Sequence, residues 1–446
     1  MATMDINSYL GKEFLCGECG KRHRVALKYI HEGGAGELGP FLEDVFGTGK
    51  EVLLLADNIT WEAAGKKCKE FIEDKYKVVP VILCPAGEKK VTARAEYLPG
   101  VEGKAQDADI ILTVGTGTIT DLGKLTGNAL GKPVLAFPSA PSMNGYTSPV
   151  AAYLKDGLKL TVSVAPAHGV FIDMSVLEES PLELVKAGFA DSLAKSSANA
   201  DWKMSSIITG ESFCSLPYKI TSRSEANYVD GGELLLKKDR RTISSLMEGL
   251  NLGGISMIIA GKSSPASGGE HMISHFLDMY SHKYRDEVFA YHGLQVGTGV
   301  FISALIYEEL KNLSAGDVRK MLAGTAVNHQ SQLEKLVSMF PESAEPIRKE
   351  FDEKMRQVAM LREALPARWE ELKRETFGMV YPPGRIRAIF SKAEIPLHLK
   401  SIAVDEAIIY NALTLARFIR GRLTVLDLAG ETGLLESFAE KYGRMS

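Results

Sequence analysis

The sequence has few of the features that mark secreted, membrane-spanning or nucleic-acid-binding proteins. Its five cysteines are odd in number and scattered, which is typical of a protein in a reducing compartment. No apolar run approaches the roughly 20 residues of a membrane-spanning helix, and the first residues lack the pattern of a signal peptide. The net charge of −4 provides no basic patch of the kind that binds nucleic acid. We therefore expect a cytoplasmic protein with no membrane span and no nucleic-acid partner.

The composition is that of an ordinary globular protein, with 45% hydrophobic and 24% charged residues. A length of 446 residues exceeds one hydrophobic core, so two domains are expected. The sequence shows no internal repeat and no low-complexity segment.

Short apolar runs alternate with helical patterns in the first part of the chain. The runs are rich in Val, Ile and Leu and cover residues 51–58, 78–85, 108–115 and 132–138, with two further strand-like pieces in 158–177. Such runs, separated by helices, are typical of buried parallel strands. We therefore predict an α/β N-terminal domain with a Rossmann-like parallel sheet.

The pattern changes after Pro181, where nearly every segment has helical spacing. We predict a boundary within 175–182, which gives an α/β domain over 1–180 and an all-α domain over 181–446. The run of mixed charges over 349–374 is expected to form a solvated pair of helices.

A phosphate-binding loop is suggested by Gly115-Thr116-Gly117-Thr118, which follows a predicted strand and precedes a helix expected to begin near Ile119. Backbone N–H groups at such a helix start can hold a pyrophosphate. The spacing differs from the GxGxxG fingerprint, and a plain tight turn is the alternative.

Other polar residues are expected at the same edge of the sheet. Asp121 lies just inside the helix, while Ser139 and Ser142 follow the next strand. Asp57 ends an earlier strand and could accept a hydrogen bond from an adenosine ribose. The alternative for Asp57, that it caps the next helix, explains its position equally well.

Four of the nine histidines lie within residues 264–293. A helix is expected to begin near Gly269, which places His271 and His275 at i and i+4 on one face. His292 stands at the start of the next apolar run. The three rings could converge with a carboxylate on a divalent metal that keeps an open coordination position. The alternative is that each is an ordinary surface or core histidine.

Cys16, Cys19 and His23 have the spacing of half a zinc knuckle. There is no second CxxC, and the remaining cysteines Cys68, Cys84 and Cys214 are isolated. A glycine-rich turn is the alternative, and any metal bound here would be structural.

The sequence resembles the sn-glycerol-1-phosphate dehydrogenase family in five motifs. In chain order they are GTGTITD, PSAPSMNGYTS, GFADSLAKSSANADW, SGGEHMISH and YHG. This family is grouped with dehydroquinate synthases, metal-dependent glycerol dehydrogenases and iron-type alcohol dehydrogenases. The resemblance spans about residues 51–313 and returns at 412–433. It implies a dehydroquinate-synthase-like fold. It also implies reduction of dihydroxyacetone phosphate to sn-glycerol 1-phosphate with NAD(H) or NADP(H) and one divalent metal.

The resemblance also implies roles for individual residues. It makes Asp191, His271 and His292 the ligands of zinc, nickel or ferrous iron, with the helical domain binding metal and substrate. His275 would contact substrate and could pass on a proton, which histidine does readily near neutral pH. The cofactor positions are Gly115, Thr116, Gly117, Thr118 and Asp121 at the pyrophosphate, and Ser139, Ser142 and Ser148 near the nicotinamide half.

Asp191 and Lys195 stand at i and i+4 and are expected to share a helix face beside the substrate. Lys195 is a candidate to bind the substrate phosphate or a relay oxygen. The alternative is an ordinary surface lysine.

The sequence departs from the family pattern at two positions. The GGG of the cofactor loop reads Gly115-Thr116-Gly117. The family's SMDG segment has Asn144 in place of the acid that contacts substrate, and an amide can neither carry charge nor act as a base.

Other functions are compatible with parts of this pattern. Dehydroquinate synthase and glycerol dehydrogenase are the alternatives within the superfamily. Asn144 favours a third alternative, a cofactor-binding protein with weakened catalysis. A homodimer is expected because it is the commonest oligomer.

Overall fold

The structure is a computed structural model that describes residues 6–85, 89–285 and 287–445. Contacts between Cα atoms divide the chain into two compact units. The first unit comprises residues 1–155, 159–192 and 219–263, and the second comprises 156–158, 193–218 and 264–446. Each unit therefore gathers segments that are distant in the sequence.

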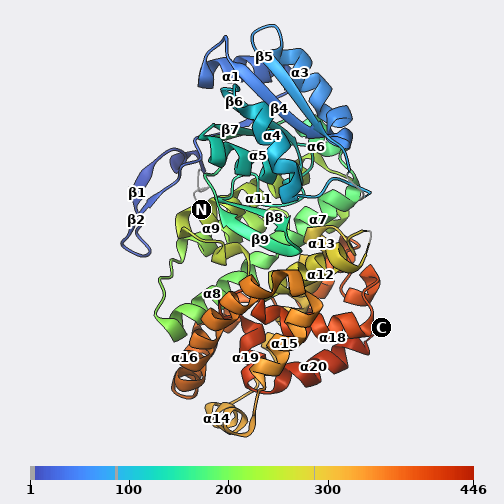
Figure 1. Cartoon of the computed structure of the whole chain (residues 1–446). Coiled ribbons are helices and arrows are strands. Elements are labelled where there is room, and N and C mark those ends of the chain that lie inside the picture. The colour runs from blue at the N-terminus through green and yellow to red at the C-terminus, as the bar shows by residue number, and fades with distance from the viewer. Residues whose placement is uncertain (1–5, 86–88, 286, 446) are drawn as a thin grey trace. The chain divides into compact units, whose positions relative to one another are not determined.

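The first unit contains a six-stranded sheet in the order β3-β10-β7-β6-β4-β5, in which every strand pair is parallel (Figure 1). Its strands are β3 (Tyr29–Glu32), β4 (Glu51–Asp57), β5 (Lys77–Leu83), β6 (Ile110–Gly115), β7 (Val134–Pro138) and β10 (Gly169–Ile172). Four of them match the predicted runs and β10 lies in a predicted strand-like piece, so the predicted Rossmann-like parallel sheet is confirmed.

Alternate residues of the central strands enter separate cores on the two faces of the sheet. Val52 and Leu54 of β4 pack with α1 (Leu38–Phe46) and α3 (Lys66–Ile72). Leu53 and Leu55 pack with α4 (Leu98–Ala105) and α5 (Gly117–Leu130) on the opposite face. The period of two along a strand thus buries the whole apolar run between two helical layers.

Four short strands of the first unit were not predicted. β3 adds a strand at the edge of the sheet next to β10. β1 (Glu13–Leu15) and β2 (Arg22–Arg24) form a two-stranded sheet, and β8 (Val150–Lys155) pairs with β9 (Leu158–Ser163), which lies in a predicted strand-like piece. The helical pattern expected after β4 is present and consists of α2 (Asn58–Thr60), a π-helical turn (Trp61–Gly65) and α3.

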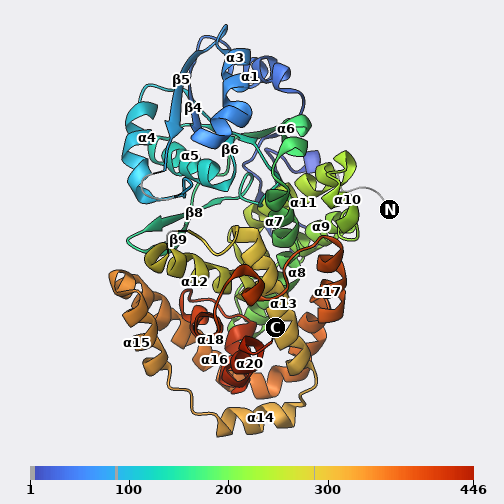
Figure 2. The ribbon, with the colours of Figure 1, turned by 90° about the vertical axis from the view of Figure 1, so that its right-hand side faces the viewer.

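Every regular element described after Ile172 is a helix, which confirms the predicted helical remainder. The first unit contributes α6 (Met174–Glu179), α7 (Leu182–Ser192), α10 (Gly232–Leu236), α11 (Arg240–Ala260) and most of α9 (Leu216–Glu225). The second unit, whose helices Figure 2 shows together, contains α8 (Ala194–Thr209), α12 (Gly269–Tyr284), α13 (His292–Lys311), α14 (Ala315–Gly324), α15 (His329–Met339), α16 (Ala344–Thr376), α17 (Pro383–Lys392), α18 (Glu406–Leu415), α19 (Val425–Glu431) and α20 (Leu434–Gly443).

α11 is the one helix among the described residues that is long and apolar enough to cross a membrane by length and composition. Its most apolar window has a mean hydropathy of 1.4, and 72% of that window is buried inside the structure. Core helices of globular domains have the same properties, so this helix is weak support for a membrane span.

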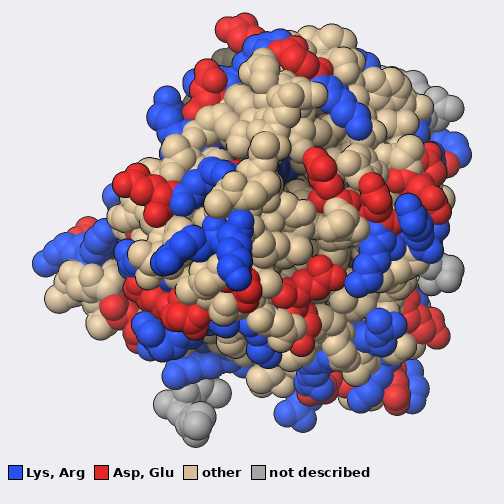
Figure 3. Space-filling view, turned by 90° about the horizontal axis from the view of Figure 1, so that it is seen from below, with Lys and Arg blue, Asp and Glu red and all other residues tan. Residues whose placement is uncertain are grey.

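The prediction of a helix pair over 349–374 is wrong, because these residues lie within the single helix α16. The helix is also less solvated than expected. Lys354 is fully buried, and its ammonium lies 2.6 Å from the carboxylate of Asp427. Elsewhere the surface carries both signs of charge, and Figure 3 shows them interspersed over one face of the molecule.

Candidate active-site residues

The predicted phosphate-binding loop joins β6 to α5. Gly115 ends the strand and Gly117 begins the helix, while the side chain of Thr116 forms no capping hydrogen bond. A Cβ on Gly115 would lie 2.8 Å from Cβ of Ile119, and one on Gly117 would lie 2.9 Å from Cε of Met143. The loop therefore requires glycine at position 115, whereas at position 117 the flexible end of Met143 would have to move. The strand–turn–helix context is that of an anion-binding helix start.

Two later glycines of α5 let the helix lie directly on the sheet. A Cβ on Gly123 would lie 2.1 Å from Cγ2 of Thr113, and one on Gly127 would lie 2.4 Å from Cγ2 of Val134. Close helix–strand packing of this kind is the task of the last glycine in dinucleotide-binding turns. The i, i+4 spacing of these glycines was a signal in the sequence that the prediction did not use.

Lys124 is a site residue that sequence reasoning missed. Its side chain is buried, and the ammonium donates to the carbonyls of Gly145 and Val150, at 2.8 and 2.5 Å, and to Oγ of Ser148 at 3.1 Å. It also lies 3.0 Å from Oδ1 of Asp121. One lysine thus holds the segment 145–150 against the first turns of α5.

Asp121 and Ser148, both predicted to bind cofactor, belong to this lysine network. Oδ2 of Asp121 accepts a hydrogen bond of 3.0 Å from the backbone of Ala152. Ser148 is almost fully buried and donates to the carbonyl of Val150 at 2.9 Å. These contacts give both residues a positioning role, while their direct contact with cofactor stays a prediction.

The loop after β7 lies beside the phosphate-binding loop, as predicted. The backbone N–H of Ser139 donates to the carbonyl of Gly115 at 3.0 Å. The hydroxyls of Ser142 and Tyr146 lie 3.3 Å apart, and that of Tyr146 donates to the carbonyl of Ala140 at 2.6 Å. Burial raises the pKa of Tyr146, so its hydroxyl stays protonated and donates within the loop. Asn144 lies in the same loop and is partly exposed.

Asp57 caps the helix that follows β4. Its Oδ1 accepts hydrogen bonds from the backbone N–H groups of Ile59 and Thr60, at 2.9 and 2.7 Å. The capping alternative is therefore observed, and binding of a ribose by Asp57 stays a prediction.

Asp191 lies in the last turn of α7, within the first unit, and is 1% exposed. A Cβ on Gly188, one turn earlier, would lie 1.8 Å from the carbonyl oxygen of Pro141. Glycine at this position therefore brings α7 against the loop that carries Ser142. The GFADS motif thus combines a close-packing glycine with a buried acid.

The expectation that Asp191 and Lys195 share one helix is wrong. α7 ends at Ser192 and α8 begins at Ala194. The hydroxyl of Ser192 donates to the carbonyl of Phe189 at 2.7 Å, a side-chain bond that competes with regular helix pairing. Lys195 is 3% exposed, so the surface-lysine alternative is also wrong.

The second unit brings the three predicted histidines together. The ring centroids of His271 and His292 lie 5.4 Å apart, and that of His275 lies 6.1 and 6.0 Å from the other two. His271 and His292 offer ligand atoms within 4.8 Å of each other. A Cβ on Gly299 would lie 2.6 Å from the carbonyl oxygen of Glu270, so this glycine lets α13 pack directly on α12.

The Nδ1 atoms of His271 and His292 both have polar partners. Nδ1 of His271 lies 3.0 Å from Oε1 of the fully buried Glu270. Nδ1 of His292 lies 3.1 Å from Oγ of Ser274 and 3.7 Å from Oδ2 of Asp278. Partners of this kind orient metal-binding histidines and leave Nε2 as the nitrogen that would bind the metal. Sequence reasoning named the histidines and missed these partners.

The DW-bearing helix α8 supports the start of α12. Asp201 accepts hydrogen bonds from Gly269 N–H at 2.8 Å, Val425 N–H at 2.9 Å and Tyr307 hydroxyl at 2.6 Å. Burial and the neighbouring Glu270 carboxylate raise the pKa of Asp201 to about 8, against the opposing effect of these donors. Asp201 therefore joins three helices beneath the histidines.

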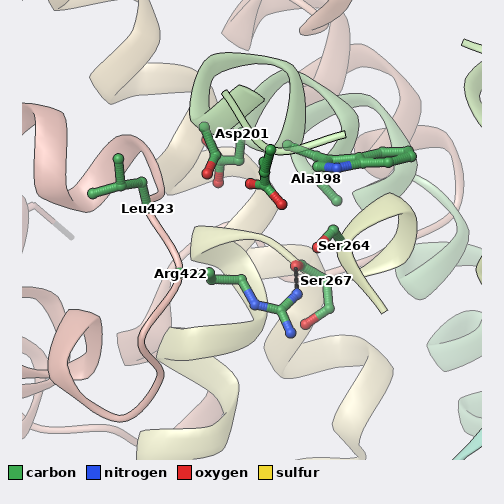
Figure 4. Close-up of a pocket in the computed structure, with 9 residues that line it drawn as sticks. Ala198, Asp201, Ser264, Ser267, Arg422 and Leu423 are labelled. Carbon is green, nitrogen blue, oxygen red and sulfur yellow. Dashed lines mark hydrogen bonds between the residues drawn. The ribbon is translucent and has the colours of Figure 1, made fainter. Parts of the chain in front are cut away.

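A small cavity beside Asp201 is shown in Figure 4, with Ala198, Ser264 and Leu423 in its lining. Its volume is about 10 Å³, which is enough for about one water molecule. Arg422 donates to the carbonyl of Ser267 at 2.9 Å, the dashed contact in the picture. Burial and the nearby Arg420 lower the pKa of Arg422 to about 10. The cavity is too small for a cofactor or sugar phosphate, so it belongs to the packing beneath the site.

Known proteins share this sequence and this fold. Residues 29–181 match the family described as iron-containing alcohol dehydrogenase. The glycerol-1-phosphate dehydrogenase (NAD(P)+) of Bacillus licheniformis is 29% identical over 442 residues, which cover 98% of this chain and 97% of the relative. That of Halalkalibacterium halodurans is 30% identical over 302 residues, or 66% of this chain and 75% of the relative.

A probable glycerol dehydrogenase from Sinorhizobium meliloti has the same fold, with a TM-score of 0.59 at 15% identity over 93% of this chain and 98% of that structure. The protein is thus an oxidoreductase with the fold of a glycerol dehydrogenase. Within that class, the chain belongs to the glycerol-1-phosphate dehydrogenase family.

Proposed function

We propose that the protein reduces dihydroxyacetone phosphate to sn-glycerol 1-phosphate with NADH or NADPH. Membership of the glycerol-1-phosphate dehydrogenase family supports this activity. The structural observation that carries it is the pair His271 and His292, whose Nδ1 atoms have polar partners on α12. That arrangement prepares two imidazoles for one divalent metal.

Asp191, His271 and His292 would hold this metal, which is zinc, nickel or iron. One carboxylate and two neutral imidazoles are a suitable donor set for each of these ions. When bound, the metal supplies Lewis acidity, which polarises the carbonyl oxygen on which negative charge develops. Asp191 is buried in α7, next to the loop with Ser142, so it would connect the metal with the cofactor loop.

The cofactor would bind at the carboxyl edge of the sheet. Backbone N–H groups at the start of α5 suit the pyrophosphate, because the side chain of Thr116 does not cap them. Ser139 and Ser142 would lie near the nicotinamide half, and Asp57 near the adenosine ribose. The Lys124 network would keep the segment 145–150 in place as the cofactor enters.

The remaining roles fall to three residues near the substrate. His275 would donate the proton that the product hydroxyl needs, since histidine exchanges protons readily near neutral pH. Lys195, which is buried, would bind the substrate phosphate. Asn144 would hydrogen-bond the substrate without adding charge.

We also propose that residues 1–180 bind cofactor and that 181–446 bind metal and substrate. A homodimer in the cytoplasm is the proposed form of the enzyme, because dimers are the commonest oligomers and the scattered cysteines suit a reducing compartment.

A substrate panel read by NAD(P)H absorbance tests the proposed activity. Dihydroxyacetone phosphate should be reduced faster than dihydroxyacetone, and glycerol should be oxidised slowly or not at all. Faster turnover of the unphosphorylated pair would identify a glycerol dehydrogenase. Cofactor binding without turnover of any substrate would support the weakened-catalysis alternative that Asn144 raises.

A further inference from the structure

The β1–β2 hairpin of the first unit is short and, among the described residues, belongs to no larger sheet. Each strand has three residues and pairs only with the other, and Figure 1 shows the hairpin apart from the six-stranded sheet. Leu15 is 68% exposed. An isolated two-stranded hairpin is marginally stable in water, so another interaction is needed to hold this one.

The turn of the hairpin gathers three metal-binding side chains. Cys16, Cys19 and His23 offer ligand atoms within 4.8 Å of one another, and Sγ of Cys19 lies 3.1 Å from Nε2 of His23. The turn is closed by Gly20, whose φ is +69° and whose N–H donates to the carbonyl of Cys16 at 2.9 Å. The glycine-rich turn and the half zinc knuckle are therefore the same structure.

Neighbouring groups orient two of these ligands. The backbone N–H of Glu18 donates to Sγ of Cys16 at 3.4 Å, which stabilises a thiolate. The His23 ring hydrogen-bonds to the backbone of Ile259 in α11. A histidine held through one nitrogen presents the other to a metal, as in known metal sites.

We propose that Cys16, Cys19 and His23 bind a structural zinc ion, separate from the active-site metal. Two thiolates and one imidazole supply three of the four ligands of a tetrahedral zinc site. The ion would cross-link the β1–β2 hairpin at its turn, and metal binding would contribute directly to the folding of the hairpin.

Zinc content of the full-length protein tests this site independently of the catalytic one. In a His271→Ala background, which should lack the active-site metal, about one zinc per chain should survive dialysis against a mild chelator. Adding Cys19→Ser should remove it. Cys84→Ser, a matched control at an exposed cysteine, should leave the zinc content unchanged. A His271→Ala protein that retains no zinc would overturn the proposal.

Cobalt substitution tests the ligands. The thiolate-to-cobalt absorption of the His271→Ala protein should be lost in Cys19→Ser and unchanged in Cys84→Ser. If Cys19→Ser does not fold, X-ray absorption of the zinc-loaded His271→Ala protein should show at least two sulfur ligands and one nitrogen. An unchanged cobalt spectrum in Cys19→Ser, or fewer than two sulfurs at zinc, would refute the assignment.

Discussion

Oε1 of Glu270 lies 3.0 Å from Nδ1 of His271, and the carboxylate has no exposed surface. Burial acts to raise the pKa of Glu270, but the hydrogen bond and charge of His271, with the N–H of Gly268, keep this pKa below its usual value. An ionised Glu270 accepts a hydrogen bond from Nδ1–H and so fixes the tautomer with Nε2 available for a metal. Its other oxygen accepts from the hydroxyl of Ser197 at 2.8 Å.

Glu270→Gln should weaken metal binding by about 10–100-fold, the usual effect of losing a carboxylate behind a metal-binding histidine. Competition with a fluorescent chelator measures the affinity, and cofactor affinity should change little. Glu309→Gln, at a partly exposed glutamate of α13, is the matched control. Equal metal affinity in the two variants would mean that Glu270 serves packing alone.

The three histidines should separate into two functions. His271→Ala and His292→Ala should lose the active-site metal, whereas His275→Ala should keep it and lose turnover. Elemental analysis and the rate of dihydroxyacetone phosphate reduction, measured on the same samples, distinguish the two classes. Metal lost from His275→Ala but kept in His292→Ala would exchange their assignments.

Lys124→Met should destabilise the first unit, because it leaves Asp121 and two carbonyls of the segment 145–150 without their buried cation. Breaking a buried ion pair costs about 3–5 kcal/mol. Denaturant unfolding gives the free energy of unfolding, and titration of NADH fluorescence should show weaker cofactor binding. Lys132→Met removes a partly exposed lysine that also donates to backbone carbonyls, and it should lower the free energy of unfolding by less. Equal losses of unfolding free energy in the two variants would argue against a special role for Lys124.

Local patterns in the sequence predicted the parallel sheet and the helical remainder because they depend on residues close in sequence. The runs that became β4, β5, β6 and β7 are apolar enough to be buried on both faces. β3 was missed because none of its four residues is buried. The break between α7 and α8 was missed because no glycine or proline marks it between Ser192 and Ala194.

The site was predictable only where a motif carries the chemistry itself. His271, His275 and His292 could be named from their spacing, and the structure places their rings together. Lys124 and Asp201 could not, because their roles come from partners distant in sequence. Asp201, for example, meets the N–H of Val425, 224 residues away. Such residues look like ordinary helix positions until the helices pack.

Asn144→Asp should raise kcat for dihydroxyacetone phosphate reduction and leave cofactor affinity nearly unchanged. The acid restores a charge that can hold a nearby cation or pass protons, and proton relay supplies up to about 10²–10⁴-fold in rate. Kinetics of the two proteins at matched pH and metal loading give the comparison. A slower Asn144→Asp enzyme would indicate that Asn144 is adapted to another substrate.

Reduction of dihydroxyacetone phosphate by metal-stripped protein, before and after a divalent metal is restored, tests the central claim most directly. NADH or NADPH consumption should be negligible without metal and should return with zinc, nickel or iron, and the product should be sn-glycerol 1-phosphate. Chirality is read with a dehydrogenase specific for the 3-phosphate, which should leave the product untouched. Undiminished turnover without metal, or a product that this second enzyme oxidises, would contradict the account.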